Sequence, residues 1–198
     1  AYNRPSLIIR PGINTDFFTL PKTTKKSSFL IVSRLVEHKN IELAIRAAIE
    51  AKVGLNIIGV GRYQNPLKQL AQGHPNIKFL GQVSESKLRF YYQTALALIC
   101  PQIEDFGLVP LESLACGTPV IALKAGGIPE NLTASTGILF NTPDPSVLAK
   151  ILNDFKPTNY LPQDCRTQAL NFNRKSFMLK FQNQVLKLWL HHQKNNDY

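Results

Sequence analysis

Residues 95–123 read ALALICPQIEDFGLVPLESLACGTPVIAL. This stretch contains two short apolar runs, at 95–100 and 119–123, with a polar loop and an expected helix over 107–115 between them. Neither run alternates apolar with polar residues, and continuous apolar runs are typical of strands buried on both faces of a parallel sheet. The stretch therefore predicts a strand–helix–strand unit of an α/β fold.

The same alternation of apolar runs and amphipathic segments extends over residues 28–154. Further strands are expected at 28–33, 55–60, 76–80 and 137–140, and further helices at 40–51, 64–72, 84–93, 128–132 and 145–154. Asn40 and Ser84 are expected to cap two of these helices. Six strands alternating with six helices predict a doubly wound, Rossmann-like parallel sheet, whose loops at the carboxyl ends of the strands line a ligand site.

The two ends of the chain differ from this body. Residues 1–27 contain a turn at Arg10-Pro11-Gly12 and a polar run, which favour a linker that enters the domain. Residues 156–198 hold no expected strand, and one face of a long helix is expected from Phe172, Phe177, Phe181, Val185, Leu188 and Trp189. We therefore expect an α/β domain over 28–155, followed by extra C-terminal helices, in a chain that is part of a longer protein.

The composition favours a folded domain without a membrane span. The 198 residues are 44% apolar and 18% charged, which suits a core of ordinary size. The longest apolar runs fall far short of the ~20 residues that cross a bilayer. Three cysteines and four histidines show no metal-binding spacing. We expect reduced thiols, no metal site, and a cytoplasmic protein without a secretory signal.

The net charge of +10 is concentrated at the two ends. Residues 1–40 and residues 156–198 each hold seven bases and two acids, whereas the residues between them are neutral overall. Basic ends suit binding of phosphates, or peripheral contact with the anionic inner face of a membrane. Alternatively, these charges only form a solvated surface. The ends lack the interleaved aromatic and basic residues of nucleic-acid-binding modules, so we expect no nucleic acid.

Two groups of residues at strand ends can carry chemistry. Glu104 lies on the loop after the run 95–100, and Glu112 lies one turn into the following helix, where free amides suit phosphate and carboxylates suit sugar hydroxyls. Arg34 and Lys39 follow the first strand and can clamp a diphosphate. Taken alone, each group also fits charges that only stabilise a helix start or face solvent.

Read together, these elements resemble a known family. They comprise Glu104 and Glu112 with seven residues between them, SLACGTPVIA at 113–122, Gly126-Gly127 with Glu130, TGILF at 136–140, Ser33-Arg34-Leu35, Lys39-Asn40, Gly59-Val60-Gly61 and FLGQVS at 79–84. In this order they resemble the C-terminal, donor-binding domain of a GT-B fold, retaining glycosyltransferase of family 4. The resemblance covers roughly residues 8–155.

The resemblance implies a role for each matching residue. Arg34 and Lys39 would hold the donor diphosphate and stabilise the leaving group, and Glu112 would hold the ribose hydroxyls. Glu104 would face the transferred sugar and the distal phosphate. Arg34, Lys39 and Glu104 would be the catalytic residues. The remaining donor-binding positions would be Ser33, which replaces the usual glycine, together with Gly61, Val83 near the base, Lys87, and the backbone amides of Phe106, Gly107 and Leu108.

The implied function is hexosyl transfer. A full-length protein would move a hexose from a nucleoside diphosphate sugar to an acceptor hydroxyl, in polysaccharide or glycolipid synthesis, with no metal or other cofactor. The motif around Glu104 most resembles bacterial mannosyltransferases, which favours GDP-mannose as donor, with UDP-glucose or another UDP-sugar as the alternative. A non-catalytic nucleotide-sugar-binding module is the other alternative. The implied partner is an N-terminal acceptor domain, without which we expect this chain to be inactive.

Overall fold

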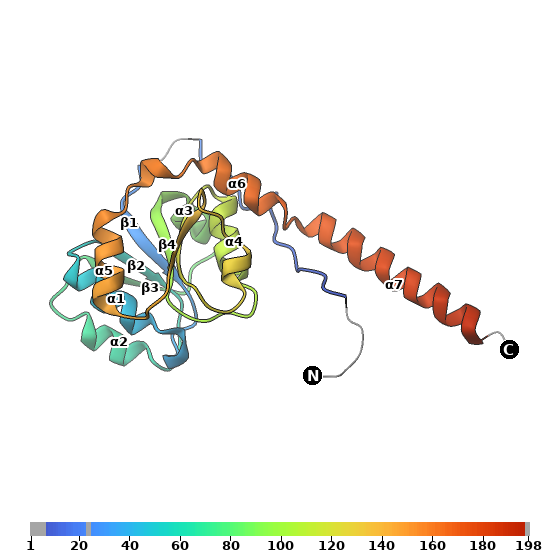
Figure 1. Ribbon diagram of the computed structural model, residues 1–198. Helices are drawn as coiled ribbons and strands as arrows, with labels where there is room; N and C mark the ends of the chain where they lie inside the picture. Colours follow the sequence, from blue (N-terminus) through green and yellow to red (C-terminus); the bar gives the residue numbers. More distant parts are fainter. Residues whose placement is uncertain (1–6, 23–24, 197–198) are drawn as a thin grey trace.

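A six-stranded parallel sheet forms the centre of the molecule (Figure 1). The computed structural model describes residues 7–22 and 25–196. The sheet order is β3-β2-β1-β4-β5-β6, and every neighbouring pair runs parallel. The strands are β1 Ser28–Val32, β2 Leu55–Ile58, β3 Ile77–Gly81, β4 Ala95–Cys100, β5 Val120–Leu123 and β6 Gly137–Phe140. The predicted doubly wound sheet is confirmed.

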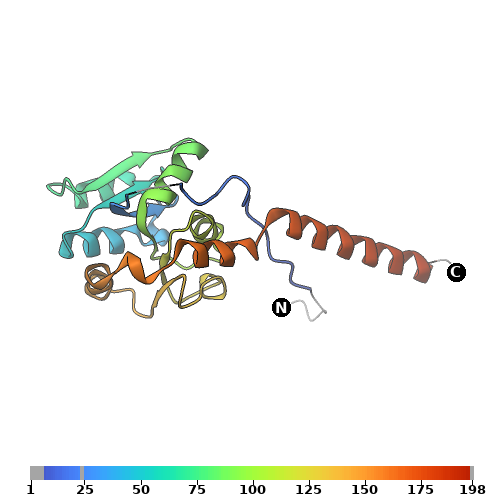
Figure 2. The same ribbon diagram turned by 90° about the horizontal axis from the view of Figure 1, so that it is seen from above.

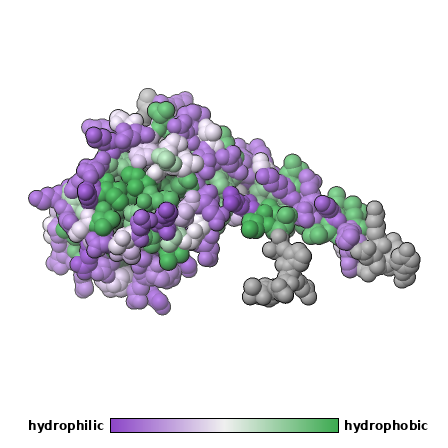
Figure 3. Space-filling model, viewed as in Figure 1, coloured by the Kyte–Doolittle hydropathy of each residue, from purple (hydrophilic) through white to green (hydrophobic). Residues whose placement is uncertain are grey.

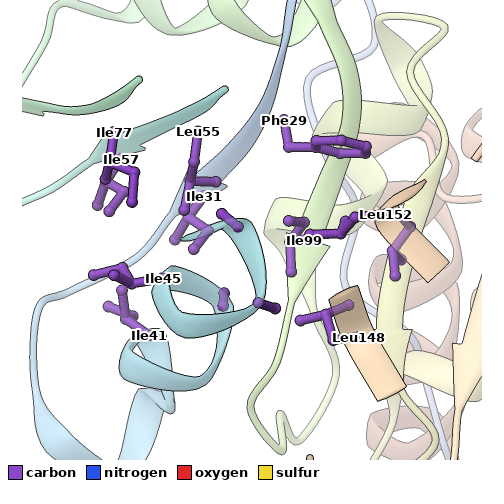
Figure 4. Packing of buried hydrophobic residues seen from close by; sticks show 14 of the residues in the cluster. Phe29, Ile31, Ile41, Ile45, Leu55, Ile57, Ile77, Ile99, Leu148 and Leu152 are labelled. Atoms are coloured by element: carbon purple, nitrogen blue, oxygen red, sulfur yellow. The ribbon is translucent and has the colours of Figure 1, made fainter. Parts of the chain in front are cut away.

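Helices cover both faces of this sheet, because successive side chains of each strand point to opposite sides. Phe29 and Ile31 of β1 are buried against α1 Ile41–Glu50, α2 Gln64–Leu70 and α5 Pro145–Asp154. Leu30 between them is buried on the other face, against α3 Glu85–Thr94, α4 Leu108–Ala115 and α6 Pro162–Leu170. Figure 4 shows Ile45 of α1 and Leu148 of α5 packed below the strand residues.

The strand order reverses between β1 and β4. From β1 the chain crosses to β2 through α1 on one face, and from β4 it crosses to β5 through α4 on the opposite face. The loops that leave β1 and β4 therefore diverge, and a crevice at the carboxyl ends of these two strands is the usual ligand site in such sheets.

Local structure agrees with the sequence expectation at Ser84 and differs from it at Asn40 and over residues 128–132. Ser84 caps α3 as expected, because its hydroxyl accepts a hydrogen bond from the Lys87 amide at 3.4 Å. Asn40 precedes α1 in the left-handed region (φ 51°), and its side chain makes no cap, since its amide donates instead to the Pro101 carbonyl at 3.4 Å. The helix expected over 128–132 is a single 3-10 turn, η2 Ile128–Glu130. Further 3-10 turns are η1 Glu37–Lys39 and η3 Pro157–Asn159.

The core also takes residues from outside 28–155. Ile13 and Phe18, from the segment expected to be a linker, are buried in the same cluster as Cys165 and Ala169 of α6. The backbone of Ile13 pairs with that of residues 172–174 through hydrogen bonds of 2.9 and 3.0 Å. Of the two expected terminal segments, residues 1–6, 23–24 and 197–198 lie outside the described residues. All three cysteines are buried and carry free thiols.

The long C-terminal helix, α7 Arg174–Asn196, projects away from the body (Figures 1 and 2). It contains the residues from Phe177 to Trp189 that were expected to form its apolar face. Phe172 instead precedes the helix and is buried, with its ring centroid 5.9 Å from that of Phe106. Figure 3 shows apolar side chains along α7 between polar ones, and Phe181, Val185, Leu188 and Trp189 are exposed. Among the described residues, no helix is long and apolar enough to cross a membrane.

Candidate functional site

An ion pair joins the loops that follow β1 and β4. Lys39 Nζ lies 2.6 Å from Glu104 Oε1, and the two side chains are only 13% and 28% exposed. The left-handed turn at Asn40 and its hydrogen bond to the Pro101 carbonyl fix the loop after β1 against the end of β4. Two predicted site residues therefore meet at the point where the strand order reverses.

Glu104 is held in place by more than this ion pair. The side-chain amide of Gln102 donates to the same oxygen, Oε1, at 3.0 Å, and the Gly127 amide donates to the Glu104 carbonyl at 2.7 Å. Among the described residues, no hydrogen bond reaches Oε2 of Glu104. The carboxylate thus has one anchored oxygen and one oxygen available for a ligand.

The loop that follows β5 supports the loop of Glu104 by close backbone contact. A Cβ at Gly127 would lie 2.1 Å from the Asp105 carbonyl oxygen, and one at Gly126 would lie 2.3 Å from the Glu104 carbonyl oxygen. Real Cβ atoms do not approach so closely, so both positions require glycine. The glycine pair seen in the sequence acts on the site through this contact.

The start of α4 offers backbone amides next to Glu104. Gly107 adopts the left-handed region (φ 88°) and is the N-cap residue of α4, so this position supplies no side-chain cap to the first turn. The carbonyl of Phe106 accepts a hydrogen bond from the side chain of Asn131, which orients the turn. Uncapped amides and the helix dipole favour an anion at this position. The predicted amides of Phe106, Gly107 and Leu108 lie here.

Glu112 lies one turn further along α4 and is half-buried. Its Oε2 accepts a hydrogen bond of 2.9 Å from the hydroxyl of Tyr92 in α3, and no hydrogen bond among the described residues reaches its Oε1. Burial raises the pKa of Glu112 to about 7, the hydrogen bond from Tyr92 lowers it, and the nearby Glu85 raises it. Glu112 can therefore change charge near neutral pH.

Ser33, Arg34 and Gly61 lie together at the end of β1. The Ser33 hydroxyl donates to the Arg34 carbonyl at 3.2 Å, and Arg34 is exposed. A Cβ at Gly61 would lie 2.2 Å from the Leu35 carbonyl oxygen, so this glycine allows the turn after β2 to pack against the turn after β1. Arg34 makes no ion pair with the described residues, so its cation is available at this edge.

Val83 lies in the turn between β3 and α3, and Lys87 lies in the first turn of α3. Val83 is half-buried and packs against the buried residues on the face of the sheet covered by α3, α4 and α6, and the Lys87 side chain is exposed. No hydrogen bond or ion pair among the described residues connects either side chain to Lys39, Glu104 or Glu112. The structure gives their place in the fold but no link to the other candidates.

Two further side chains lie in this site although the sequence did not predict them as site residues. Gln102 is buried at the end of an apolar strand, and its Oε1 has no hydrogen-bond partner among the described residues. Tyr92 is fully buried. A polar residue two positions after an apolar strand was a usable signal for Gln102, whereas nothing in the sequence paired Tyr92 with Glu112.

The arrangement suits a phosphorylated sugar. It combines cations at the end of β1, uncapped helix amides, and two carboxylates with one available oxygen each. Cations and amides bind phosphate, and carboxylates accept hydrogen bonds from hydroxyls. The described residues contain no group of three or more His, Cys, Asp or Glu side chains that could hold a metal ion.

Comparison with known sequences places the chain among sugar-transferring proteins. The family model described as "Glycosyl transferases group 1" matches residues 12–186. A GDP-mannose-dependent monoacylated alpha-(1-6)-phosphatidylinositol monomannoside mannosyltransferase of Corynebacterium glutamicum is 34% identical over 61% of this chain and 35% of its own length. The O-antigen chain mannosyltransferase RfbU of Salmonella typhimurium is 33% identical over 69% of this chain and 40% of its own length.

Solved structures share the fold. Sucrose-phosphate synthase from Thermosynechococcus elongatus has a TM-score of 0.80 at 25% identity, covering 92% of this chain and 52% of that one. HepE of Anabaena, solved with UDP and glucose, has a TM-score of 0.72 at 18% identity, covering 88% of this chain and 55% of that one. The chain thus spans about two fifths or less of these curated relatives and about half of these solved chains.

Proposed function

The chain belongs to the glycosyl transferases of group 1, and from this premise we propose that it is the donor-binding domain of a retaining glycosyltransferase of family 4. The full-length protein would move a hexose from a nucleoside diphosphate sugar to an acceptor hydroxyl. The observation that carries this proposal is the ion pair of Lys39 and Glu104 beside the uncapped start of α4, at the reversal point of the sheet.

Each group in the site has a part in the proposed transfer. The bond between the anomeric carbon and the diphosphate oxygen breaks, and a bond from that carbon to the acceptor oxygen forms with the configuration retained. The proton of the acceptor hydroxyl passes to the departing diphosphate. Arg34 and Lys39 neutralise the charge that develops on the departing diphosphate, and the amides at the start of α4 bind its oxygens. Since two cations and a helix dipole supply this neutralisation, the proposal invokes no metal.

The two carboxylates divide the donor between them. Glu104, next to the amides, accepts hydrogen bonds from the transferred sugar through its available oxygen. Glu112, one turn along α4, accepts hydrogen bonds from the ribose hydroxyls. The turn with Ser33 and Gly61 lies beside the phosphates, and Val83 and Lys87 lie on the side of the base.

GDP-mannose is the donor that we propose, for synthesis of a polysaccharide or glycolipid. Support comes from the names of the two relatives above, which are mannosyltransferases, one of them GDP-mannose-dependent. UDP-glucose is the alternative, and HepE, which was solved with UDP and glucose, favours it.

A second domain that binds the acceptor is part of the proposal. The relatives are more than twice as long as the part that matches this chain, and α7 exposes Phe181, Leu188 and Trp189 without a covering element among the described residues. We propose that the second domain packs on α7 and that the present chain alone catalyses no transfer.

We also propose a cytoplasmic location with peripheral contact at the inner face of the membrane. Between residues 174 and 193, α7 carries four Lys or Arg residues and no acid. The cations of this helix suit an anionic lipid surface.

Titration calorimetry of this chain tests the proposed donor site. We expect binding of GDP, or of UDP if the alternative donor is correct, to be stronger than binding of the matching nucleoside. Lys39→Ala should abolish most of that difference, and Lys68→Ala, on the exposed face of α2, should leave it unchanged. Equal binding of diphosphate and nucleoside by the parent chain would reject the proposed site. Sugar transfer by the full-length protein then separates an enzyme from a non-catalytic binding module.

A further inference from the structure

The hydroxyl of Tyr92 forms the described hydrogen bond to the Glu112 side chain. It donates to Oε2 at 2.9 Å, from α3 to α4, and the Tyr92 side chain is fully buried. Because Oε2 is occupied by this donor, Oε1 is the oxygen that a ligand can reach. The sequence motif implies a role for Glu112 and none for Tyr92.

Tyr92 is held rigidly enough to act as a fixed donor. Its carbonyl accepts a hydrogen bond of 2.5 Å from the Thr118 hydroxyl, which in turn accepts one of 2.8 Å from Lys26 Nζ. The ring packs edge-to-face on Phe18, with centroids 5.8 Å apart. The position of the hydroxyl is therefore set by the backbone and by ring packing, independently of Glu112.

We propose that Tyr92 is a positioning residue for the nucleotide, acting through Glu112: by donating to Oε2, its hydroxyl holds the half-buried carboxylate in place and leaves Oε1 to face the ribose. This inference rests on the proposed donor site. It adds a residue that touches no part of the donor and yet tunes how tightly the ribose is bound.

The surroundings of Glu112 make the hydrogen bond from the Tyr92 hydroxyl important for the pKa of its carboxyl group. Burial and Glu85 of α3 raise the pKa of Glu112, and the Tyr92 hydrogen bond is the opposing influence. At the C-terminal end of α4, the buried Cys116 thiol has a pKa raised to about 12, so it stays neutral. Without the Tyr92 bond the carboxyl becomes protonated over more of the neutral range and loses acceptor capacity toward the two ribose hydroxyls.

Three more distant cations complete the surroundings. Arg89 of α3 and Arg166 of α6 act on the Cys116 thiol. Lys26 reaches the other end of Tyr92 through Thr118, and burial lowers its pKa to about 8. These groups are the same in the parent and in a Tyr92→Phe variant, so a ratio of the two proteins' affinities removes their contribution.

The first measurement follows Glu112 directly, without ligand. The carboxyl carbon of Glu112 is titrated by NMR in glutamate-labelled protein and assigned by its loss in Glu112→Gln. We expect Tyr92→Phe to raise the pKa of Glu112 by about one pH unit, since a hydrogen bond to a charged group is lost. Tyr91→Phe, the neighbouring half-buried tyrosine, is the matched control and should leave that pKa unchanged.

The second measurement follows the nucleotide. With the pKa of Glu112 at about 7, a rise of about one lowers the ionised fraction roughly fivefold at pH 7 and by less than about 1.2-fold at pH 9. The affinity of Tyr92→Phe for GDP or UDP should therefore fall about fivefold at pH 7 and return to near the parent value at pH 9. In a Glu112→Gln background, adding Tyr92→Phe should produce no such pH dependence.

The outcomes separate this inference from the proposed function. An unchanged Glu112 pKa in Tyr92→Phe, or an affinity ratio that is the same at pH 7 and pH 9, means that Tyr92 only supports the fold and overturns the inference. If the pKa rises as expected but the parent binds no nucleoside diphosphate at either pH, the positioning of Glu112 stands and the proposed function fails.

Discussion

Lys39 Nζ lies 2.6 Å from Glu104 Oε1, so the ammonium that we assign to the diphosphate is already paired with the carboxylate that we assign to the sugar. The two side chains belong to loops after the neighbouring strands β1 and β4. A diphosphate that reaches Lys39 must share the ammonium with Glu104. Replacing either partner alone therefore leaves the other one unpaired and changes the charge that it offers to a bound ligand.

Glu104→Gln should strengthen the binding of free nucleoside diphosphate. The substitution removes a negative charge next to the phosphates and releases Lys39, and a partly exposed ion pair is worth up to about 1 kcal/mol. We expect a two- to fivefold gain in affinity by calorimetry, together with a loss of transfer of about a hundredfold in the full-length protein. Glu50→Gln, at the exposed end of α1, is the control. A loss of diphosphate affinity in Glu104→Gln would show that this carboxylate does not oppose the phosphates.

Arg34→Ala and Lys39→Ala should weaken diphosphate binding and spare nucleoside binding. A hydrogen bond to a charged group contributes about 1.5–3 kcal/mol, which corresponds to roughly a ten- to hundredfold loss. Arg34 makes no ion pair among the described residues, whereas Lys39 leaves Glu104 unpaired when it is removed. The loss for Lys39→Ala should therefore be the larger one. If both variants bind diphosphate as the parent does, the phosphates lie elsewhere.

Much of the fold follows from the sequence. Continuous apolar runs such as that of β4 place strands correctly because a parallel sheet buries both faces. The sequence does not show that Ile13 and Phe18 enter the core, because they lie in a segment without strand or helix periodicity and are buried by α6, which is distant in the chain. Nor could it show that Phe172 leaves the face of α7, since the spacing of apolar residues continues across the helix start.

The sequence named candidate residues but not the contacts between them. It placed Lys39 and Glu104 on loops after two different strands, and the structure brings these two side chains together at the reversal point. Asn40 looked like a helix cap, yet its left-handed backbone turns the side chain to Pro101 instead. Contacts of this kind join loops from non-adjacent segments, and residue types alone carry no information about them.

Gly127→Ala should destabilise the protein and disturb the site together. The φ of Gly127 is −87°, which any residue adopts, but its Cβ would lie 2.1 Å from the Asp105 carbonyl oxygen. Forcing atoms into such a contact costs about 1–3 kcal/mol, and relief of the clash must move the loop that carries Glu104. Urea unfolding should show this loss, and affinity for diphosphate should fall with it.

Gly73→Ala is the matched control for that variant. A Cβ at Gly73 meets nothing within 4 Å, although its φ of 83° is strained for alanine. We expect a stability loss of about 1 kcal/mol with diphosphate affinity unchanged. Unchanged affinity in Gly127→Ala as well would mean that the loop after β5 does not support the site.

Glu112→Gln should remove a pH dependence of stability. The pKa of Glu112 is raised to about 7 in the folded chain from an ordinary value of 4.5, mainly by burial. Between these values the folded state holds more protons than the unfolded state, so the free energy of unfolding falls as the pH rises from about 4.5 to 7. The size of this fall is up to about 3 kcal/mol, and Gln, which cannot ionise, does not incur it.

The measurement is the difference in unfolding free energy between Glu112→Gln and the parent, from urea titrations at several pH values. That difference should grow in favour of the variant from pH 4.5 to 7 and then level off. Glu42→Gln serves as the opposite control, because hydrogen bonds from Arg46 and Tyr63 lower the pKa of Glu42. Its carboxylate stabilises the fold above its ordinary pKa and loses that effect as the pH falls, so Glu42→Gln should be less stable than the parent at pH 7. A flat difference curve for Glu112→Gln would mean that Glu112 titrates normally and that its burial against Tyr92 carries no electrostatic cost.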